Sequence, residues 1–403
     1  MKRLLRQLFA IDHLFVTAIA ILLIGILVQL TVNLSFLNPM ARTIENFSLT
    51  DVFYDINRSV GDPDTSDVIT LVDMTEIYDR ARLADIFDSI QALEPAVVGV
   101  DIVFEGWRGD STGTRRMRDA ASRASSPTVF SYRLSDWEES EQEFRTSQRS
   151  IIFGPDFPPL QQIQEGYTNV HHSLNGSTVR SFSISRRAHG HIEHSMPAKV
   201  ATTFMGDTTL YTQLSDQTID FTATHFRVVH PDSLRQNADL IRSHIVLLGA
   251  TADGLDMHFT PIGRMPGLEV LAYAVQTMLN QSNVTLLSSC QTFAFSVFVL
   301  WLVQLLQYLC TSYFNSRKGF LSQYIGQSDL PSSWVAITAM VILIGLCFWW
   351  FIHGVYINTM WALMGIALLD NARSLYKFCI VLLEHRFHWK WLQRSLYYTE
   401  TNH

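Results

Sequence analysis

The feature that most constrains this chain is an uncharged apolar run near its start, residues 14–32, with the sequence LFVTAIAILLIGILVQLTV. Its length matches the roughly 20 residues that an α-helix needs to cross the hydrocarbon core of a bilayer. Lys2, Arg3 and Arg6 precede the run, and the stretch after it offers no convincing small-x-small site for signal cleavage. We therefore expect a retained signal anchor that spans the membrane.

Three further apolar stretches near the C-terminus also have the length of membrane spans, at about 291–313, 334–353 and 356–372. The sequence thus predicts four transmembrane α-helices, one N-terminal and three C-terminal. The alternative, that these runs are buried helices of a soluble protein, fits their length and their charged flanks poorly.

The charges separate along the chain and predict its orientation. Residues 34–289 contain twenty Lys and Arg against thirty-two Asp and Glu, and the rest of the chain contains ten against five. Short basic segments beside membrane spans stay in the cytoplasm, so the acidic block is expected outside and both termini inside. An acidic surface disfavours nucleic acid and anionic lipid as its partners.

This layout divides the chain into four expected parts. They are a cytoplasmic N-terminus and anchor at 1–33, an extracytoplasmic domain at 34–289, a three-helix membrane region at 290–383 with a cytoplasmic loop near 314–333, and a basic and aromatic cytoplasmic tail at 384–403. The layout is typical of a multi-pass protein of a bacterial inner membrane.

The four cysteines all lie at or within the C-terminal membrane region, at Cys290, Cys310, Cys347 and Cys379. The external domain therefore has no cysteine to pair and must be stabilised by an ordinary core, for which about 250 residues are ample. Zinc ribbons, c-type haem and cysteine-based catalysis are excluded in that domain.

Hydrophobic periodicity predicts a βαβ unit in the external domain. A β-branched run at 68–74 is followed by a helical stripe at 82–95 and a second buried run at 96–104. The crossover rule makes the two strands parallel in one sheet. Further strands are expected at 128–134, 179–188 and 245–251, a helix at 266–280 and a surface insertion at 136–165. The fold class is therefore α/β, with a mostly parallel sheet covered by helices.

Two carboxylates lie near the carboxyl ends of the first two strands, Asp73 and Asp101. Ligands of open α/β sheets bind at that edge, so both side chains, with Glu105, are candidates to line a ligand cleft. The alternative is that each caps a helix or accepts hydrogen bonds from loop amides. No G-x-G-x-x-G or Walker loop follows either strand, so a nucleotide phosphate has no cradle there.

Six segments in order resemble the second class of CHASE domains, extracytoplasmic sensory modules associated with bacterial cyclases and histidine kinases. The segments are DVFYDINR (51–58), VITLVDMTE (68–76), EPAVVGVDIVF (94–104), GYTNVHHSLNGSTVRSF (166–182), IVLLGATADGLDMHFTP (245–261) and PGLEVLAYAVQTML (266–279). The resemblance implies a sensory domain followed by a bundle of three spans. One departure is the stretch TEIYDRARLADIF, which lacks the glycine and the Trp-Pro pair common in the family.

The family usually continues into a cytoplasmic enzyme, whereas only about 25–30 residues follow the last expected span here. We therefore expect a sensor without an output module of its own. Family analogy also places the loop 249–263, with Asp253 and Asp256, beside the strand ends. Four carboxylates there could hold a divalent cation, contact an organic ligand or organise the loop.

The histidines of HGHIEH are a second possible metal site. His189 and His191 would share one face of a strand, but their spacing is not that of structural zinc sites, and solvated strand-end histidines are the simpler interpretation. We expect no metal and no cofactor.

Two groups are candidates for coupling to the membrane or to a partner. Asp370 and Arg373 are three residues apart and can pair on one helix face, either at the interface or deeper between helices. Trp389 and Trp391 lie in a tail that alternates basic and aromatic residues, as interfacial helices do.

Three functions remain after these observations. The leading hypothesis is a non-enzymatic sensor or relay subunit, which binds an unknown external ligand and acts through a membrane protein partner or a cytoplasmic effector. The second is a structural subunit of an envelope complex. The third, an anchored extracytoplasmic enzyme, lacks an identifiable nucleophile. Nucleic acid is not expected as a partner; the lipid bilayer is.

Overall fold

The computed structural model divides the chain into two compact units, residues 50–284 and residues 1–49 with 285–403. We describe each unit by itself. The residues that the structure describes are 10–33, 49–60, 64–106, 111–154, 160, 162–169, 178–212, 216–222, 224–252, 256–281, 285–317, 319, 324–326, 328–388 and 395–396.

The first unit is built on a sheet that is mostly parallel, as the sequence predicts. Its parallel strands have the order β10-β1-β11-β2-β3-β5. In addition, β4 pairs antiparallel with β3, and β8 pairs antiparallel with β7. The bounds are β1 Asp64–Asp73, β2 Val97–Val100, β3 Thr128–Glu138, β4 Glu143–Gln148, β5 Ile163–Tyr167, β7 Ser185–Ala188, β8 His191–His194, β10 Thr224–Val229 and β11 Ile245–Gly249.

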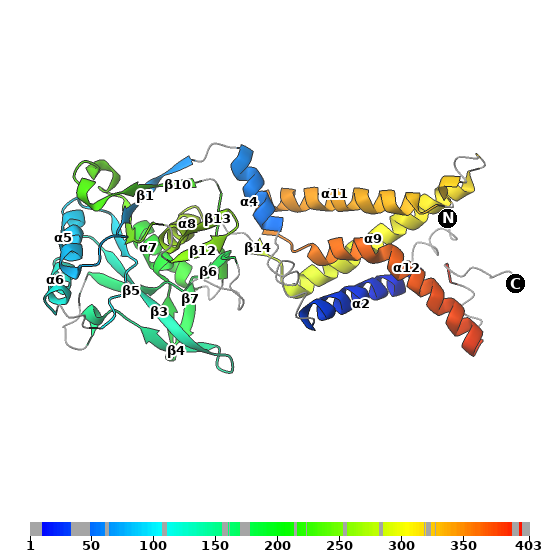
Figure 1. Ribbon diagram of the computed structural model, residues 1–403, viewed down its shortest axis with the longest axis horizontal. Helices are drawn as coiled ribbons and strands as arrows, with labels where there is room; N and C mark the ends of the chain where they lie inside the picture. Colours follow the sequence, from blue (N-terminus) through cyan, green and yellow to red (C-terminus); the bar gives the residue numbers. More distant parts are fainter. Residues whose placement is uncertain are drawn as a thin grey trace. The chain divides into compact units, whose positions relative to one another are not determined.

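Helices cover both faces of the sheet (Figure 1). Helices α5 (Arg80–Gln91) and α6 (Ser111–Ser122) pack on one face, and α7 (Met196–Met205) and α8 (Gly267–Leu279) on the other. Strands buried on both sides explain the near-continuous apolar runs in the sequence. The core beneath α5 and α6 includes Val72, Val98, Val100, Phe130, Val246 and Leu248 from the strands and Leu83, Phe87, Ile90 and Met117 from the helices.

Two glycines let α7 approach the sheet closely. A Cβ atom on Gly166 of β5 would lie 2.6 Å from Cα of Met196, at the start of α7. A Cβ on Gly99 of β2 would lie 2.6 Å from Cδ2 of Leu247 and 2.9 Å from Cε of Met196. The first contact is with backbone, which cannot move aside, so α7 can pack at this distance only because residue 166 has no side chain.

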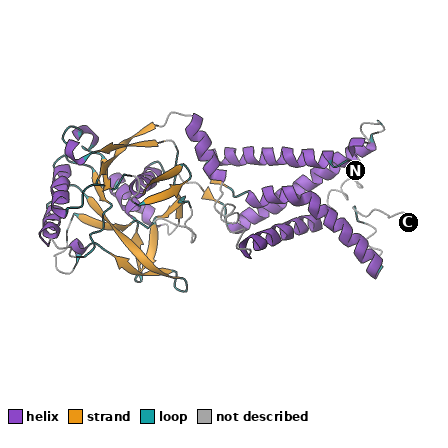
Figure 2. Cartoon of the chain, in the orientation of Figure 1, coloured by secondary structure: helices purple, strands orange, loops and turns teal. Residues whose placement is uncertain are grey.

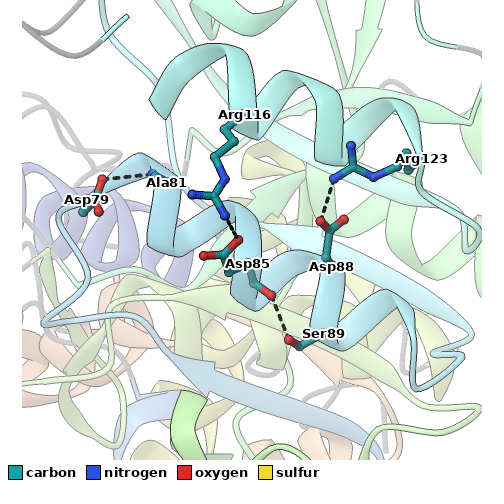
Figure 3. A network of polar contacts seen from close by, with 7 residues as sticks. All are labelled: Asp79, Ala81, Asp85, Asp88, Ser89, Arg116 and Arg123. Carbon is teal, nitrogen blue, oxygen red and sulfur yellow. Dashed lines mark hydrogen bonds and ion pairs between the residues drawn. The ribbon is translucent and has the colours of Figure 1, made fainter. Parts of the chain in front are cut away.

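Polar contacts join α5 and α6 on their outer side (Figure 3). Asp79 caps α5 by accepting a hydrogen bond from the amide of Ala81 at 2.9 Å. Asp85 of α5 forms an ion pair with Arg116 of α6 at 2.5 Å, and Asp88 forms one with Arg123, the residue after α6, at 2.6 Å. Exposed pairs of this kind contribute little to stability, about 0–1 kcal/mol each.

Smaller elements complete the first unit, as the secondary-structure view shows (Figure 2). Helix α4 (Leu49–Val60) is fixed by an ion pair of Asp51 with Arg180 at 2.5 Å. The remaining elements are the antiparallel pairs β6 (Ser181–Ser183) with β9 (Asp216–Thr218) and β12 (Met257–Thr260) with β13 (Gly263–Pro266), and the 3₁₀ turns Ile151–Phe153, Thr209–Thr212, Pro231–Ser233 and Ala238–Leu240.

Three expectations about local structure need correction. The segment 136–165 is not a surface insertion, because β4 and β5 both belong to the sheet and β5 pairs in parallel with β3. The strand expected at 179–188 is two short strands, β6 and β7. His189 is not in a strand: it adopts φ 52° in the turn between β7 and β8, so it does not share a strand face with His191.

The second unit consists mainly of four long helices: α2 (Ile11–Asn33), α9 (Ser289–Ser316), α11 (Leu330–Ile352) and α12 (Met360–Phe387), with a two-residue pairing of β14 (Thr285–Leu286) and β15 (Val355–Tyr356). Among the described residues, α9 and α11 are long and apolar enough to cross a membrane. The apolar part of α2 is shorter, Ile11–Leu27, and α12 contains several charged side chains. Length and composition therefore support two candidate spans.

Candidate functional site

A cavity of about 460 Å³ lies at the carboxyl ends of the parallel strands in the first unit. Its volume is in the range of small-molecule sites, roughly 300–1,000 Å³. Residues that follow β2, β11 and β5 contribute to its wall, together with the first turns of α8. The described lining residues are Asp101, Val103, Glu105, Arg133, Thr168, Asn169, Ala250, Asp256, His258, Gly267, Leu268 and Leu271.

Asp101 is the first residue after β2, and its amide donates to the carbonyl of Leu248 in β11 at 2.8 Å. The residue is half-buried in the wall of the cavity, and the burial of its carboxyl group, together with the nearby charge of Asp256, raises its pKa to about 6. The charges of Arg133 and His258 oppose that shift. Asp101 is thus an acid that the fold holds in an unfavourable environment.

Ser131 of β3 places a buried hydroxyl beside Asp101. Its side chain is fully buried and lies close enough to Asp101 to favour the ionised carboxylate. The geometry nevertheless leaves its hydroxyl without a proper hydrogen-bond partner among the described residues. A buried hydroxyl without a well-placed partner is costly, and a bound ligand is one explanation for such a group beside a cavity.

Asp256 and His258 form the side of the cavity next to α8. Nε2 of His258 lies 3.4 Å from Oδ1 of Asp256. The amide of Gly267, the first residue of α8, donates to the carbonyl of Asp256 at 2.8 Å. A Cβ on Gly267 would lie 2.4 Å from Oδ2 of Asp256, so the glycine makes room for this carboxylate at the N-terminus of the helix.

The opposite side chains come from β3 and the segment after β5. Asn169 is fully engaged, because it accepts from the amide of Leu134 and donates to the carbonyl of the same residue, both at 2.7 Å. Arg133 lies at an exposed position of β3, and its guanidinium forms no ion pair or hydrogen bond with a described residue. Its guanidinium is therefore available to an anionic group in the cavity.

Glu105 lines the mouth of the cavity and is exposed. The loop that carries it is held by Arg80, whose guanidinium donates to the carbonyls of Glu105 and Gly106 at 3.0 and 2.9 Å and to the hydroxyl of Thr114 at 2.7 Å. The backbone that carries the Glu105 side chain is therefore held in place.

Asp73 does not line the cavity. Its Oδ1 accepts from the amide and the hydroxyl of Thr75, at 3.0 and 2.5 Å, and from the amide of Thr251 at 3.4 Å. Burial would raise the pKa of Asp73, but these hydrogen bonds outweigh it, so the pKa is lower than usual. The carboxylate thereby fixes the turns after β1 and β11, which is the alternative role considered for it.

The structure therefore brings three of the five predicted ligand residues together: Asp101, Glu105 and Asp256. Asp73 belongs to a neighbouring turn, and Asp253 lies outside the described residues. In the part of the chain that the structure describes, no group of three or more His, Cys, Asp or Glu side chains is placed to hold a metal ion.

A second cluster of charges, which the sequence did not indicate, lies on β5, α7 and β8. Arg149 bridges Glu165 and Glu193, at 2.8 and 2.9 Å, and its guanidinium lies 4.2 Å from the ring centre of Tyr132. Nζ of Lys199 donates to the carbonyl of Glu165 at 2.5 Å. Burial raises the pKa of Glu165 and lowers that of Lys199. The charges largely compensate one another, so this cluster connects strands to α7.

The pair predicted in the C-terminal helices is present. Arg373 donates to Asp370 at 2.9 Å within α12 and to Oε1 of Gln307 in α9 at 2.5 Å. Gln307 in turn donates to the carbonyl of Ser332 in α11 at 3.0 Å. Helix α12 continues to Phe387, so the pair joins three helices of the second unit. Trp389 and Trp391 lie outside the described residues.

Sequence reasoning missed Arg133, His258, Thr168 and Asn169 as cavity residues. A signal existed for Arg133, because residues 129, 131 and 133 of a strand share one face and the last of them is charged. His258 follows Asp256 by two residues, and Thr168 and Asn169 follow a strand that the sequence did not predict. Without the strand order, neither pair could be placed beside Asp101.

Comparison with known proteins gives one positive result. The family model described as CHASE2 domain matches residues 18–308, well over half of the chain. No curated protein and no solved structure matches the chain. The match includes all the cavity residues and extends into α2 and α9. This chain therefore belongs to the CHASE2 family of sensory extracellular domains.

Proposed function

We propose that the protein is a non-enzymatic, membrane-anchored sensor whose α/β unit binds a small ligand in the cavity beside Asp101. The observation that carries this proposal is the group of polar side chains at the cavity: an acid whose pKa is raised by burial, a buried hydroxyl without a partner and a guanidinium without a partner among the described residues. Membership of a sensory family supports the same function. Burying an ionised carboxyl costs stability, and a ligand that offers it an opposite charge gains affinity by lowering that cost.

The proposed topology places the α/β unit outside a bacterial inner membrane and both termini in the cytoplasm. It treats α2, α9, α11 and α12 as four spans. Support comes from the length and composition of α9 and α11, from the uncharged run in α2 and from the basic residues at the flanks of these helices.

The signal is proposed to pass to a separate membrane or cytoplasmic partner protein. Ligand binding must favour one of two arrangements of the helices for this to occur. The hydrogen bonds of Gln307 and Arg373 connect α9, α11 and α12. A shift of one of these helices should therefore displace the other two. Helix α11 also presents exposed apolar side chains, including Trp334, Ile337 and Val341, to lipid or to a partner helix.

The test uses the full-length protein in lipid nanodiscs and hydrogen exchange measured by mass spectrometry. A small-molecule fraction of the host's growth medium is the probe. We expect slower exchange in the peptides that contain Asp101 and residues 256–271, and a change in α9 or α12. Ala250→Phe, which fills the cavity wall, should remove the effect, and Ala92→Phe at the exposed end of α5 should not.

Two outcomes would contradict the proposal. One is protection that is equal in both variants, since the ligand would then bind elsewhere. The other is recovery of the protein from its native membrane in a complex of fixed composition, with no response of exchange to any fraction. That result would favour a structural subunit of an envelope complex.

A further inference from the structure

The cavity has a mixture of charges that narrows the class of its ligand. Its described wall contains three carboxylates, Asp101, Glu105 and Asp256, against one guanidinium, Arg133, and one imidazole, His258. A purely anionic ligand would meet an excess of negative charge, and a purely cationic ligand would make no contact with the exposed guanidinium of Arg133. A ligand that carries both charges satisfies both sides.

The two charges required of the ligand must lie close together. Asp101 is near enough to Asp256, Arg133 and His258 for each of them to influence its ionisation. Asp101 and Asp256 repel one another, and a cation between them would relieve that repulsion. Arg133 lies on the neighbouring strand β3, so an anionic group bound to it is only a short distance from that cation.

Apolar residues complete the wall. Val103 follows β2, and Leu268 and Leu271 belong to the first turns of α8. Leu268 and Leu271 are buried, so they offer a preformed apolar surface and not a flexible one. The ligand therefore has an aliphatic part beside its charged groups.

We propose that the cavity binds a small zwitterion of the α-amino-acid type, with its ammonium group between Asp101 and Asp256, its carboxylate on Arg133 and an aliphatic side chain against α8. This inference rests on the proposed function and specifies its ligand. The buried hydroxyl of Ser131, which lacks a partner among the described residues, lies next to Asp101 and stabilises the carboxylate when the ammonium group arrives.

The test compares three probes of nearly equal size with the full-length protein in nanodiscs. They are L-leucine, isoamylamine, which lacks the carboxylate, and 4-methylpentanoate, which lacks the ammonium group. Each is titrated while hydrogen exchange at the cavity is followed, and the other proteinogenic amino acids are then screened in competition. We expect an aliphatic amino acid to bind about ten- to a hundredfold more tightly than either analogue, since a lost charge-assisted contact costs that much.

Variants assign the contacts. Arg133→Met should reduce the preference for the amino acid over its amine, and Asp256→Asn should reduce its preference over the carboxylic acid, each by about tenfold or more. Arg145→Met removes an exposed arginine of β4 that pairs with Glu138, and it should leave both preferences unchanged.

The possible failures are separable. If the growth-medium fraction protects the cavity but no amino acid does, the ligand class is wrong and the sensor function stands. If an analogue with a single charge binds as tightly as every amino acid, or if Arg133→Met leaves the preference intact, the zwitterion proposal is overturned. If nothing protects the cavity, the sensor function fails as well.

Discussion

Replacing Asp101 by asparagine should stabilise the ligand-free protein at neutral pH. The pKa of this acid is raised from the ordinary 3.8 to about 6, first by burial and then by Asp256. Each pKa unit is worth about 1.4 kcal/mol, so ionising Asp101 costs the folded protein about 3 kcal/mol. Because the folded-state pKa lies above the unfolded one, the cost is absent below about pH 4 and complete above about pH 6.

The assay is native-state hydrogen exchange on the full-length protein, read from peptides of β2 and β11. These buried strands report the free energy of opening of the sheet. The wild type should lose about 3 kcal/mol of that free energy between about pH 4 and pH 7 through Asp101. Asp101→Asn should remove most of this dependence and raise the opening free energy at neutral pH by about 1–3 kcal/mol.

Asp73→Asn is the matched control, with the opposite sign. The pKa of Asp73 is lowered because its hydrogen bonds from Thr75 and Thr251 outweigh the effect of burial. Its ionised form therefore stabilises the fold above the unfolded pKa, and that stability is lost as the pH falls. The asparagine variant should be less stable at neutral pH. If Asp101→Asn destabilises the protein in the same way, Asp101 is a structural contact and the reasoning about the cavity is refuted.

Three further predictions concern packing, the cavity and the helices. Gly166→Ala places a methyl group 2.6 Å from the backbone of α7 and should lower the free energy of unfolding, measured by chemical denaturation, by about 1–3 kcal/mol. Gly99→Ala should cost less, because its methyl group meets only the ends of side chains. Equal losses of stability in the two variants would contradict this. Gly267→Ala displaces the Asp256 carboxylate and should weaken the binding of an amino acid, measured by calorimetry, by about tenfold, with little loss of stability. An unchanged affinity would show that this carboxylate lies outside the ligand site. Arg373→Ala should lower the stability of the helical unit in detergent by about 1–2 kcal/mol, whereas Lys377→Ala at an exposed position should not; a similar loss for both would mean that the interhelical contact contributes nothing.

The parallel sheet could be predicted because its central strands are short apolar runs. Residues 68–74, 96–104 and 245–251 each contain a strand of the sheet, although β2 covers only Val97–Val100 of the second range. The helix between the first two packs on the sheet through the stripe that the spacing indicated. The strand order could not be predicted. Nothing local in residues 245–251 shows that this strand inserts between the two strands of the βαβ unit.

The candidate site was predictable only in part, for the same reason. Asp101 and Asp256 are close in space because β11 lies beside β2 and the chain then turns to begin α8. Asp73 follows an equally suitable strand, but Thr75 and Thr251 engage its carboxylate first. Whether a loop amide or a ligand binds such a carboxylate depends on differences in distance of less than an ångström. The hydrophobic periodicity of the sequence does not encode differences of that size.

The position of β11 has a consequence for biogenesis. Its neighbours on either side, β1 and β2, are synthesised long before it, since residues 101–244 separate it from the end of β2. Until it arrives, two apolar strand edges have no partner, and unpaired edges invite association with other chains. Assembly from such distant segments is intrinsically slow. Folding of this unit should therefore depend on a holding chaperone, and truncation before Ile245 should yield aggregates.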